Sequence, residues 1–379
     1  MIQKLEVFGS AIAGICSRSL VVPGKPLRWT VIANPKAGGF TINSRWKNHS
    51  RILAEALERA GKNPPRGDAA PSAAVLTAGE NAGGTAFGAY GLVSTTGAGH
   101  AGEVVSALLN EAAGSGNKAV YLVITAGGDG TSLESLRVLF TAPESLRSRF
   151  IILRLPLGTG NDGADSPDLA KALDLLINPS QPEKTRGVQL SVSSTGRIWP
   201  DGKPLLAFNI LSLGLDAFVT HMTNKMKGKL PGDSYKLWVD IAALLYDRLY
   251  KVGPLSVKGY DENGREVMNF TEKILLCAVG VSGHRTYGSM KKILPDERNV
   301  CAVKQMSLFR KLAIKGLFTT GGHASGPESI MGNAHRLEIS GENPILAQMD
   351  GETVLLQKED FPVVVELTAP VIKKLVPLP

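Results

Sequence analysis

Apolar runs and amphipathic stretches alternate along the first half of the chain. Four runs have the length and composition of strands buried on both faces, and each is followed by apolar residues at helical spacing. Four strand–helix units in succession predict an open parallel sheet covered by helices. The predicted strands are 27–33, 92–96, 119–124 and 150–155. The predicted helices are 44–60, 100–113, one from near Thr131 and one after Ser166.

The period of the pattern changes to two after Pro182, which predicts a β-rich second domain resembling a β-sandwich. A hairpin is expected where 257–260 and 267–270 flank an Asp-Glu-Asn-Gly turn. An amphipathic helix is expected at 235–250, packed on the β domain in preference to facing lipid. The other predicted strands are 188–192, 207–211, 274–281, 300–307, 336–339, 345–349, 353–356 and 363–367.

The length of 379 residues favours two domains. The change of period places their boundary near residue 180. We therefore expect an α/β domain at 28–180 and a β-rich domain at 181–368. The remaining parts are an N-terminal extension at 1–27, a loop insertion at about 63–89, and a C-terminal tail at 369–379 that can return to the first domain.

Composition and charge restrict the partners. A net charge of +8 favours anionic partners such as nucleotide phosphates, nucleic acid or an acidic membrane face. Aromatic residues make up only 6% and no basic-aromatic stripe appears, so we expect no nucleic acid. Three widely spaced cysteines indicate neither a disulfide framework nor a zinc site and fit a reducing compartment. No apolar run reaches 18 residues, so no transmembrane span is expected.

Candidate chemistry gathers where the predicted parallel strands end. The third strand runs into Gly127-Gly128-Asp129-Gly130-Thr131, where glycines allow successive N–H groups to form an anion-binding nest before a helix begins. This arrangement suits a polyphosphate with its Mg²⁺, although a plain glycine turn is the alternative. Unusual loops also follow 33, 96 and 156, and ligands of open α/β sheets bind at these carboxyl ends.

Three motifs carry a family likeness: Asn34-Pro35-x-x-Gly38, Gly127-Gly128-Asp129-Gly130-Thr131-x-x-Glu134, and Pro156-x-Gly158-Thr159-Gly160-Asn161-Asp162. Together they resemble the diacylglycerol kinase catalytic-domain family, which includes soluble bacterial lipid kinases, sphingosine kinases and ceramide kinases. Further signatures of this family resemble Thr95-Thr96 with Gly99-His100-Ala101, Gly214-Leu215-Asp216-Ala217 and Asp350-Gly351-Glu352.

The resemblance implies an ATP-dependent lipid kinase. Such an enzyme transfers the γ-phosphoryl group of ATP to a hydroxyl of a lipid such as diacylglycerol or a sphingoid base. Its active site lies in the cleft between an N-terminal nucleotide-binding domain and a β-rich acceptor domain. By resemblance, ATP with Mg²⁺ is bound by Asn34, Thr96, Gly127, Gly128, Asp129, Gly130, Thr131, Glu134, Gly158, Thr159, Asn161 and Glu352.

The carboxylates are assigned by the same resemblance. Asp129 and Glu134 are the candidate Mg²⁺ ligands, since Mg²⁺ takes few protein carboxylates. Asp350 is the leading general base and Asp129 its rival. Without the family, Asp350-Gly351 between alternating strands predicts only a hairpin turn. Asp216 either shapes the acceptor site or stabilises a loop.

Several alternatives stay open at this point. The segment 295–300 lacks the Asp-Gly of many bacterial members, which puts a structural Mg²⁺ near 296–300 in doubt. A kinase resembling NAD kinases and a non-catalytic nucleotide- or lipid-binding regulator are the competing functions. We expect a cytoplasmic protein with peripheral contact to an anionic membrane, and the sequence allows a homodimer. Basic residues suited to such contact are Lys225, Lys227, Lys229, Lys291, Lys292, Arg310, Lys311 and Lys315.

Overall fold

The structure is a computed structural model that describes residues 1–67, 75–76, 91–116, 118–158, 161–166, 168–192, 205–226, 246–288 and 291–378. It contains two compact units, one formed by Met1–Thr185 with Pro370–Pro379 and the other by Arg186–Ala369. Within the described ranges, every helix is too short or too polar to cross a bilayer.

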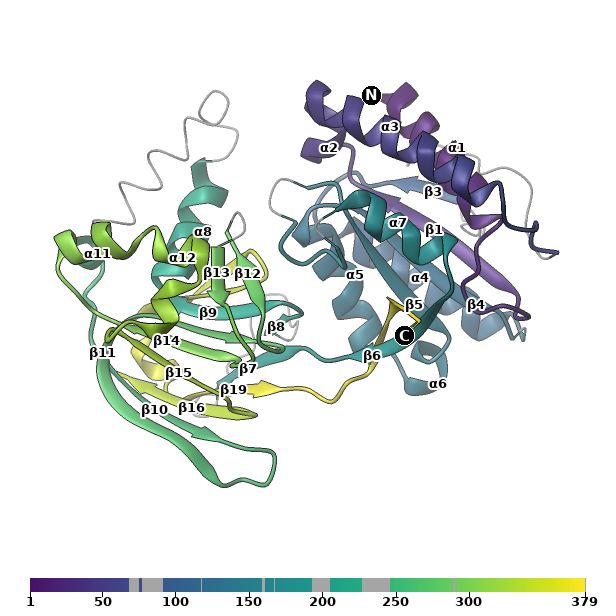
Figure 1. Cartoon of the computed structure of the whole chain (residues 1–379). Coiled ribbons are helices and arrows are strands. Elements are labelled where there is room, and N and C mark those ends of the chain that lie inside the picture. Colours follow the sequence, from purple (N-terminus) through teal and green to yellow (C-terminus); the bar gives the residue numbers. More distant parts are fainter. Residues whose placement is uncertain are drawn as a thin grey trace. The chain divides into compact units, whose positions relative to one another are not determined.

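The first unit is built on a sheet of seven described strands in the order β2-β3-β1-β4-β5-β20-β6 (Figure 1). All neighbouring strands are parallel except β6, which runs antiparallel to β20. The predicted open parallel sheet is therefore confirmed. The strands are β1 (Leu27–Ala33), β2 (Val75–Leu76), β3 (Gly91–Ser94), β4 (Val120–Gly127), β5 (Phe150–Pro156), β6 (Ser180–Thr185) and β20 (Ile372–Pro377).

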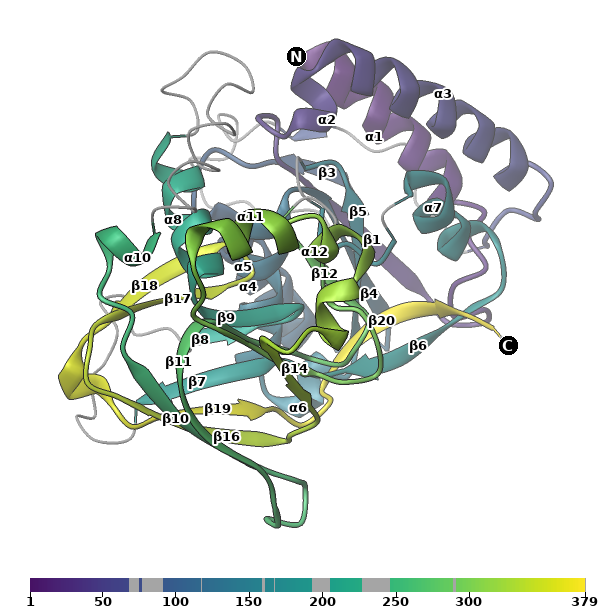
Figure 2. The same cartoon turned by 60° about the vertical axis from the view of Figure 1, so that its left-hand side comes forward.

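Helices cover both faces of this sheet (Figures 1 and 2). Helices α1, α3 and α7 pack together on one face, and α4 packs beside α5 on the other. Their apolar stripes face the sheet, as the sequence period predicts. The helices are α1 (Ile2–Cys16), α2 (Gly38–Thr41), α3 (Asn43–Ala60), α4 (His100–Gly114), α5 (Asp129–Thr141), α6 (Glu144–Arg147) and α7 (Leu169–Ile177).

Residues 1–27 contribute to the core of this unit. Phe8, Ile12 and Ile15 of α1 are fully buried, and the ring of Phe8 contacts that of Phe40 edge to face, with centroids 5.3 Å apart. The N-terminal extension expected at 1–27 therefore contains a helix, α1, that packs into the core of the α/β unit.

The second unit contains one large antiparallel sheet of eleven described strands. The fifteen-residue strand β11 pairs with β10 through its first half and with β9 and β14 through its second half. The sheet curls around the apolar core (Figure 2), which confirms the β-rich class and gives the sandwich-like packing. The strands are β7 (Val188–Val192), β8 (Leu205–Ala207), β9 (Ile210–Gly214), β10 (Pro254–Tyr260), β11 (Glu266–Gly280), β14 (Val300–Lys304), β15 (Ser329–Gly332), β16 (Arg336–Gly341), β17 (Ile345–Met349), β18 (Glu352–Leu356) and β19 (Val363–Leu367). A separate hairpin joins β12 (Arg285–Tyr287) to β13 (Lys291–Leu294).

The strand expected at 207–211 is two strands. Phe208 and Asn209 interrupt it between β8 and β9, because their backbone N–H groups donate to the carboxylate of Asp350 and not to a neighbouring strand. The helix expected at 235–250 lies largely outside the described residues, of which α10 (Tyr246–Leu249) is helical.

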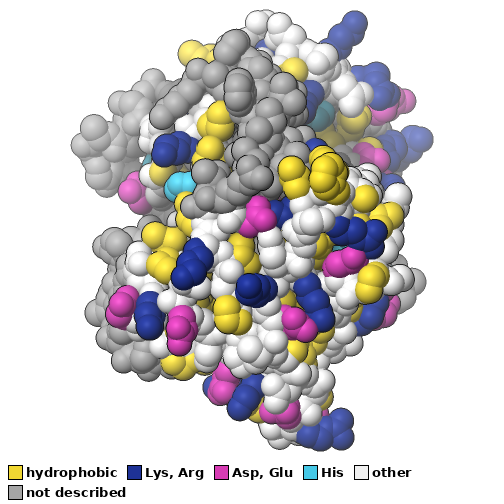
Figure 3. All heavy atoms as spheres, turned by 90° about the vertical axis from the view of Figure 1, so that its left-hand side faces the viewer, with side chains coloured by type: hydrophobic (Ala, Val, Ile, Leu, Met, Phe, Trp, Pro, Cys, Tyr) yellow, Lys and Arg dark blue, Asp and Glu magenta, His cyan; other side chains and the backbone are white. Residues whose placement is uncertain are grey.

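Three further helices lie on the second unit: α8 (Leu215–Met226), α11 (Leu308–Ile314) and α12 (Leu317–Thr320). Helix α8 begins directly after β9 and packs against β17 and β18. Helices α11 and α12 follow one another after β14 on the side of the molecule that faces the viewer in Figure 3, where hydrophobic side chains and Lys and Arg side chains lie next to one another at the surface.

Candidate active site

The loops that follow β3, β1, β4 and β5 lie in a row, because these strands are parallel neighbours. From β1 the chain moves outward to β3 and then returns to the other side of β1 to form β4. Such a reversal of strand order is the usual ligand site of an open α/β sheet. A pocket of about 670 Å³, open to solvent, lies here. Its walls are Asn34, Lys36, Thr95, Thr96, Gly97, Ala98, Ala101, Gly130, Thr131 and Glu134.

Close backbone contact explains two of the glycines beside this pocket. A Cβ on Gly127 would lie 2.6 Å from Oγ1 of Thr131 and 3.2 Å from Cβ of Asn34. A Cβ on Gly158 would lie 2.5 Å from Cα of Gly128. The loops after β4 and β5 can therefore approach one another only with glycine at 158, while glycine at 127 leaves room for the side chains of Thr131 and Asn34. The structure brings Asn34, Gly127, Thr131 and Gly158 together, whereas Thr159 lies outside the described residues.

Asp129 is the first residue of α5 and lies at the base of these loops. Its Oδ1 accepts a hydrogen bond from the backbone N–H of Gly163 (2.9 Å). Burial raises the pKa of the Asp129 carboxyl, and the Gly163 N–H and the Arg154 guanidinium oppose that rise without cancelling it. The loop after β5 thus covers a carboxylate that is poised to hold a proton at higher pH than an ordinary Asp.

Asn161 belongs to the same loop and has the left-handed φ of 59°. Its buried Oδ1 has no hydrogen-bond partner among the described residues. This oxygen lies 2.8 Å from where a Cβ of Gly158 would stand. The strained backbone places a polar atom against the glycine loop, and residues in such conformations concentrate at functional sites.

Glu134 is positioned by the start of the neighbouring helix α4. Its Oε1 accepts from the N–H of Gly99 (2.8 Å), and its Oε2 accepts from the N–H of Ala101 (3.2 Å). The turn before α4 is closed by the N–H of Thr96, which donates to Nδ1 of His100 (3.2 Å). Glu134 therefore joins α5 to the loop after β3 and shapes the pocket wall that contains Thr96.

The carboxylates of this site fit a Mg²⁺ ion bound chiefly by phosphate and water. In the described part of the chain, no three His, Cys, Asp or Glu side chains form a group that could hold a metal ion. A nucleotide-bound Mg²⁺ needs only one or two protein carboxylates. Since both oxygens of Glu134 already accept from backbone N–H groups, Asp129 is the carboxylate best suited to contact such an ion.

Asp350 lies at the turn between β17 and β18 in the second unit, with φ 47° and a side chain that is buried. Its carboxylate accepts from the backbone N–H groups of Phe208, Asn209 (3.1 and 3.2 Å) and Ile210 (3.0 Å). Three backbone N–H groups thus engage both carboxylate oxygens, with that of Asn209 shared between them. Asp350 thus fixes the β8–β9 connection. The neighbouring Glu352 begins β18 and is exposed.

Asp216 is part of a buried polar network in the same unit. Its Oδ2 accepts from the hydroxyl of Ser212 (2.7 Å) and from Nε2 of Gln348 (3.3 Å). Oε1 of Gln348 in turn accepts from the N–H of Gly351 (3.1 Å). The network connects α8 to the turn that contains Asp350.

An apolar cavity of about 920 Å³, including space open to solvent, lies beside Asp216. Most of its wall is apolar, with Lys291, Lys311 and Lys315 adding positive charge. Lys311 is buried, with Nζ 2.7 Å from Oδ1 of Asp247. The apolar wall is formed by Leu215, Val219, Leu275, Leu276, Ile293, Val303, Met306, Ile314 and Phe318. Its chemistry suits a ligand with a long hydrocarbon part.

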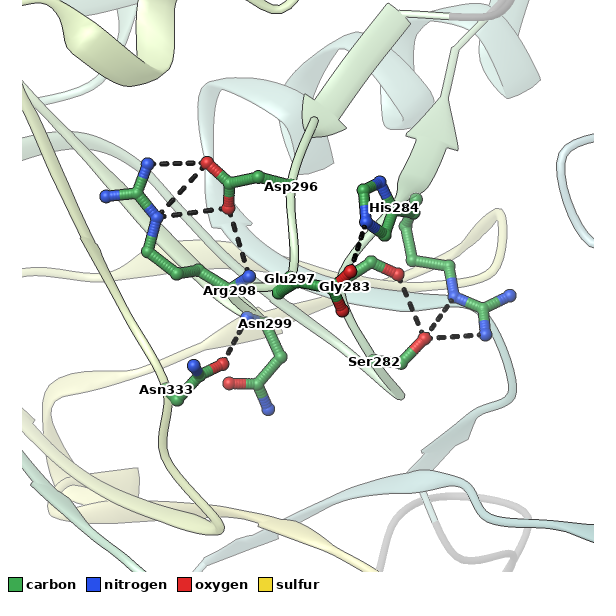
Figure 4. A network of polar contacts seen from close by, with 9 residues as sticks. Ser282, Gly283, His284, Asp296, Glu297, Arg298, Asn299 and Asn333 are labelled. Atoms are coloured by element: carbon green, nitrogen blue, oxygen red, sulfur yellow. Dashed lines mark hydrogen bonds and ion pairs between the residues drawn. The ribbon is translucent and has the colours of Figure 1, made fainter.

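The segment 295–300 carries an ion pair within the second unit (Figure 4). The guanidinium of Arg298 donates twice to the carboxylate of Asp296, with the shorter contact at 2.5 Å, and lowers the pKa of Asp296 to about 2. Oδ1 of Asn333 accepts from the N–H of Asn299 (3.0 Å) and fixes the end of the loop. Arg298 therefore supplies the positive charge beside Asp296 that a structural Mg²⁺ near 296–300 would otherwise supply.

The sequence analysis missed a buried ion pair that supports the site. Oδ1 of Asp165 accepts from the Arg154 guanidinium (2.8 Å), and Oδ2 accepts from the Arg154 N–H (2.7 Å). This pair folds the loop after β5 back onto its own strand, so that Gly163 reaches Asp129. A charged residue inside the otherwise apolar run 150–155 was the available signal.

Comparisons with known proteins agree with this description. Residues 63–189 match the model of the diacylglycerol kinase catalytic domain. A crystal structure described as a "putative diacylglycerol kinase" from Bacillus anthracis str. Sterne is 18% identical, with a TM-score of 0.53, and covers 92% of this chain and 96% of its own. A second structure of that description gives 18% and 0.52 with the same coverage. No curated protein matches the chain. The resemblance to the diacylglycerol kinase catalytic-domain family is therefore confirmed by the family model over residues 63–189. The two solved structures share the fold over most of the chain.

Proposed function

We propose that the protein is an ATP-dependent lipid kinase that transfers the γ-phosphoryl group of ATP to a lipid hydroxyl. The observation that carries the proposal is the pocket at the carboxyl ends of β3, β1 and β4, with glycine loops and the start of α5 beside it. Backbone N–H groups at such a position suit phosphate oxygens. The match to the diacylglycerol kinase catalytic domain supports a kinase over other nucleotide-binding proteins.

The proposal assigns the nucleotide to the first unit. Asn34, Thr96 and Lys36 line the pocket, and Thr131 with Gly130 begins its helical side. We assign phosphate contacts to the loops that contain Gly127, Gly128, Gly158, Thr159 and Asn161. Mg²⁺ bound with the nucleotide would neutralise phosphate charge and would be held by phosphate oxygens and water, with Asp129 contacting it only through a bound water and Glu134 positioning the wall. Phosphoryl transfer depends mainly on such positioning and charge neutralisation.

The general base is assigned to Asp129 in preference to Asp350. A carboxylate whose pKa is raised by burial accepts a proton from a hydroxyl more readily than an ordinary one. The acceptor positions of Asp350 are filled by three backbone N–H groups, so it would have to release them to act as a base. We propose that Asp350 orders the turn it belongs to, with Glu352 as its exposed neighbour.

The lipid is assigned to the second unit. The cavity beside Asp216 has room and apolar surface for acyl or sphingoid chains, and Asp216 supplies a polar group at its wall.

The chain also has three buried cysteine thiols, as expected for a reducing compartment. A cytoplasmic enzyme that meets its acceptor at a membrane is consistent with these features.

The experiment is a transfer assay with radiolabelled ATP, Mg²⁺ and a panel of diacylglycerol, monoacylglycerol, sphingosine and ceramide in mixed micelles. We expect label in the lipid phase with at least one acceptor. Asp129→Asn should lower the rate by about a hundredfold to a thousandfold. Glu58→Gln, an exposed carboxylate on α3, is the matched control and should retain full activity. Label transferred to NAD alone, or ATP binding without transfer to any lipid, would contradict the proposal.

A further inference from the structure

Helix α11 has an unusual division of its side chains. The side chains on its inner face are Ile314 and Lys311, both buried, and Nζ of Lys311 pairs with Asp247. It exposes apolar side chains on the other side, including Phe309 with 84% of its surface accessible. In a soluble amphipathic helix the apolar residues face inward. The outer face of α11 is therefore not explained by the packing of the unit.

The exposed apolar residues form one group with those of α12. Of the twelve large hydrophobic side chains that are exposed among the described residues, four lie within ten positions of one another. They are Leu308, Phe309, Leu312 and Leu317. Scattered single hydrophobic residues need no explanation, but a group of this kind marks a contact surface.

The charge around this group is positive. The run 306–327 contains Arg310, Lys311 and Lys315 and no Asp or Glu, but Arg310 donates to the adjacent Glu328 (2.6 and 3.1 Å) and Lys311 pairs with Asp247. The exposed Lys315 adds positive charge beside the group. Lys292 is exposed on β13, and its Cδ lies 3.8 Å from where a Cβ of Gly321, at the end of α12, would stand. Hydrophobic side chains lie beside Lys and Arg side chains on this face, with Asp and Glu side chains among them (Figure 3). Exposed apolar side chains with Lys292 and Lys315 beside them match the interface of an anionic bilayer, where apolar side chains enter the acyl boundary and cations meet headgroups.

The same two helices form a wall of the apolar cavity. Lys311 and Ile314 from α11, Lys315, and Phe318 from α12 line it from the inside, while Phe309 and Leu312 face outward. A surface that seats α11 and α12 at a membrane thus brings the cavity to the level where lipid headgroups begin. A second protein is a weaker candidate, because four side chains cannot supply the roughly 1,200 Å² of buried surface that a stable interface requires.

We propose that the α11–α12 segment, residues 307–320, is the membrane-docking surface of this protein and that its partner is a bilayer containing anionic lipid. Leu308, Phe309, Leu312 and Leu317 enter the interface, and Lys292 and Lys315 lie at headgroup level. The proposal rests on the assigned lipid kinase function for its purpose, since a lipid acceptor must be drawn from a membrane. Its physical basis is independent of catalysis.

The test uses the full chain with a fluorophore on a single new cysteine. All three native cysteines are buried, so Phe309→Cys provides the accessible thiol for a polarity-sensitive dye. We expect a blue shift on addition of vesicles of phosphatidylcholine with 30% phosphatidylglycerol, and a much smaller one with phosphatidylcholine alone. Dye on Val267→Cys is the control, because Val267 is also exposed, at 42%, but lies in the β10–β11 hairpin. Equal shifts at both positions, or none at 309, would overturn the proposal.

Vesicle cosedimentation of unlabelled variants gives a second measurement. Phe309→Ser with Leu312→Ser should weaken binding to the anionic vesicles at least tenfold, and Lys315→Glu about fivefold or more. Val267→Ser should bind like the unchanged protein. Because the replaced side chains are exposed, Tm should stay the same in every variant. Unchanged binding of the double variant, or its conversion from dimer to monomer with vesicle binding retained, would show that the surface serves another purpose.

Activity separates this proposal from the proposed function. The double variant should phosphorylate a short-chain acceptor dispersed in solution at the normal rate, but should need at least tenfold more bilayer-embedded acceptor. Vesicle binding without any kinase activity would refute the kinase assignment and leave the docking surface standing. Kinase activity on the dispersed acceptor without vesicle binding would do the reverse.

Discussion

The carboxylate of Glu134 on α5 accepts a 2.8 Å hydrogen bond from the backbone N–H of Gly99, the residue that precedes α4. Because its second oxygen accepts from Ala101, this side chain holds the unpaired N–H groups at the start of α4. Glu134 is a candidate Mg²⁺ ligand, yet each of its oxygens accepts from a backbone N–H group. A substitution can separate the role of metal ligand from that of helix cap.

Glu134→Gln should destabilise the protein by about 1–2 kcal/mol, because an amide nitrogen would replace one of two acceptor oxygens at backbone N–H groups. The KM for ATP should rise while the Mg²⁺ concentration for half-maximal activity stays the same. Thermal unfolding and Mg²⁺ titration of activity measure these effects. Glu103→Gln, an exposed change in the first turn of α4, should alter neither. A large shift in the Mg²⁺ requirement would instead identify Glu134 as a ligand.

Gly158→Ala should disrupt the contact between the loops after β4 and β5. The new Cβ would lie 2.5 Å from Cα of Gly128, and neither backbone can move without displacing the other loop. We expect a loss of about 1–3 kcal/mol in the free energy of unfolding and weakened ATP binding. Gly97→Ala is the matched control, because Gly97 lines the same pocket and a Cβ there would meet no atom within 4 Å. Calorimetric ATP titration of both variants measures this difference in ATP binding.

Asp129→Asn should lose activity yet unfold at a higher temperature. Burial raises the pKa of this carboxyl in the folded protein above the ordinary value of 3.8, so the ionised group carries a stability cost. That cost is present above the folded pKa and disappears as the pH falls through it towards 3.8. The variant should therefore be more stable at pH 7.5, measured as a higher Tm. Near pH 4 the gain should vanish, and a constant gain at both pH values would contradict the assigned cause.

The same raised pKa predicts the acid limb of activity. If Asp129 must be ionised to accept the hydroxyl proton, kcat/KM falls as the pH drops through the raised pKa. The limb should lie above the range of an ordinary Asp, and it should be measured with the dispersed acceptor so that membrane contact does not contribute. A limb in the ordinary range would mean that another group limits the rate.

Asp350→Asn should act mainly on stability. The amide can accept at one atom only, which leaves buried N–H groups of Phe208, Asn209 or Ile210 without their partner. We expect a loss of about 2 kcal/mol or more, with kcat reduced less than tenfold at a temperature where the variant is folded. Glu352→Gln is the control for a change at the same turn and should leave stability unaltered, because Glu352 is exposed. A normal Tm with kcat lost by orders of magnitude would restore Asp350 as the general base.

Local patterns were sufficient to predict the elements of the α/β sheet. The predicted strand at 27–33 is β1, and the run at 119–124 lies in β4 from residue 120 onward, because a strand buried on both faces has to be apolar along its length. The glycine motifs also indicated correctly where the chain breaks from strand to loop, since the steric reason lies in the glycine itself.

The side-chain partners could not be predicted in the same way. Glu134 and Asp350 both bind backbone N–H groups far away in sequence, at Gly99 and at Phe208–Ile210, and a backbone N–H leaves no mark in the sequence. The break between β8 and β9 was missed for this reason, since the run 207–211 is apolar throughout apart from Asn209. The position of α1 in the core is likewise a property of tertiary packing and not of its own pattern.

The place of β20 in the first sheet has a consequence for how the chain matures. This strand pairs with β6 from Ile372 opposite Thr185 to Pro377 opposite Ser180, and it contacts β5 on its other side. Residues 186–369 are therefore synthesised while the first sheet still has a gap between β5 and β6. A ribosome must release residues 372–377 before that gap can close, so the sheet whose synthesis begins first is completed only after residues 186–369 have been made.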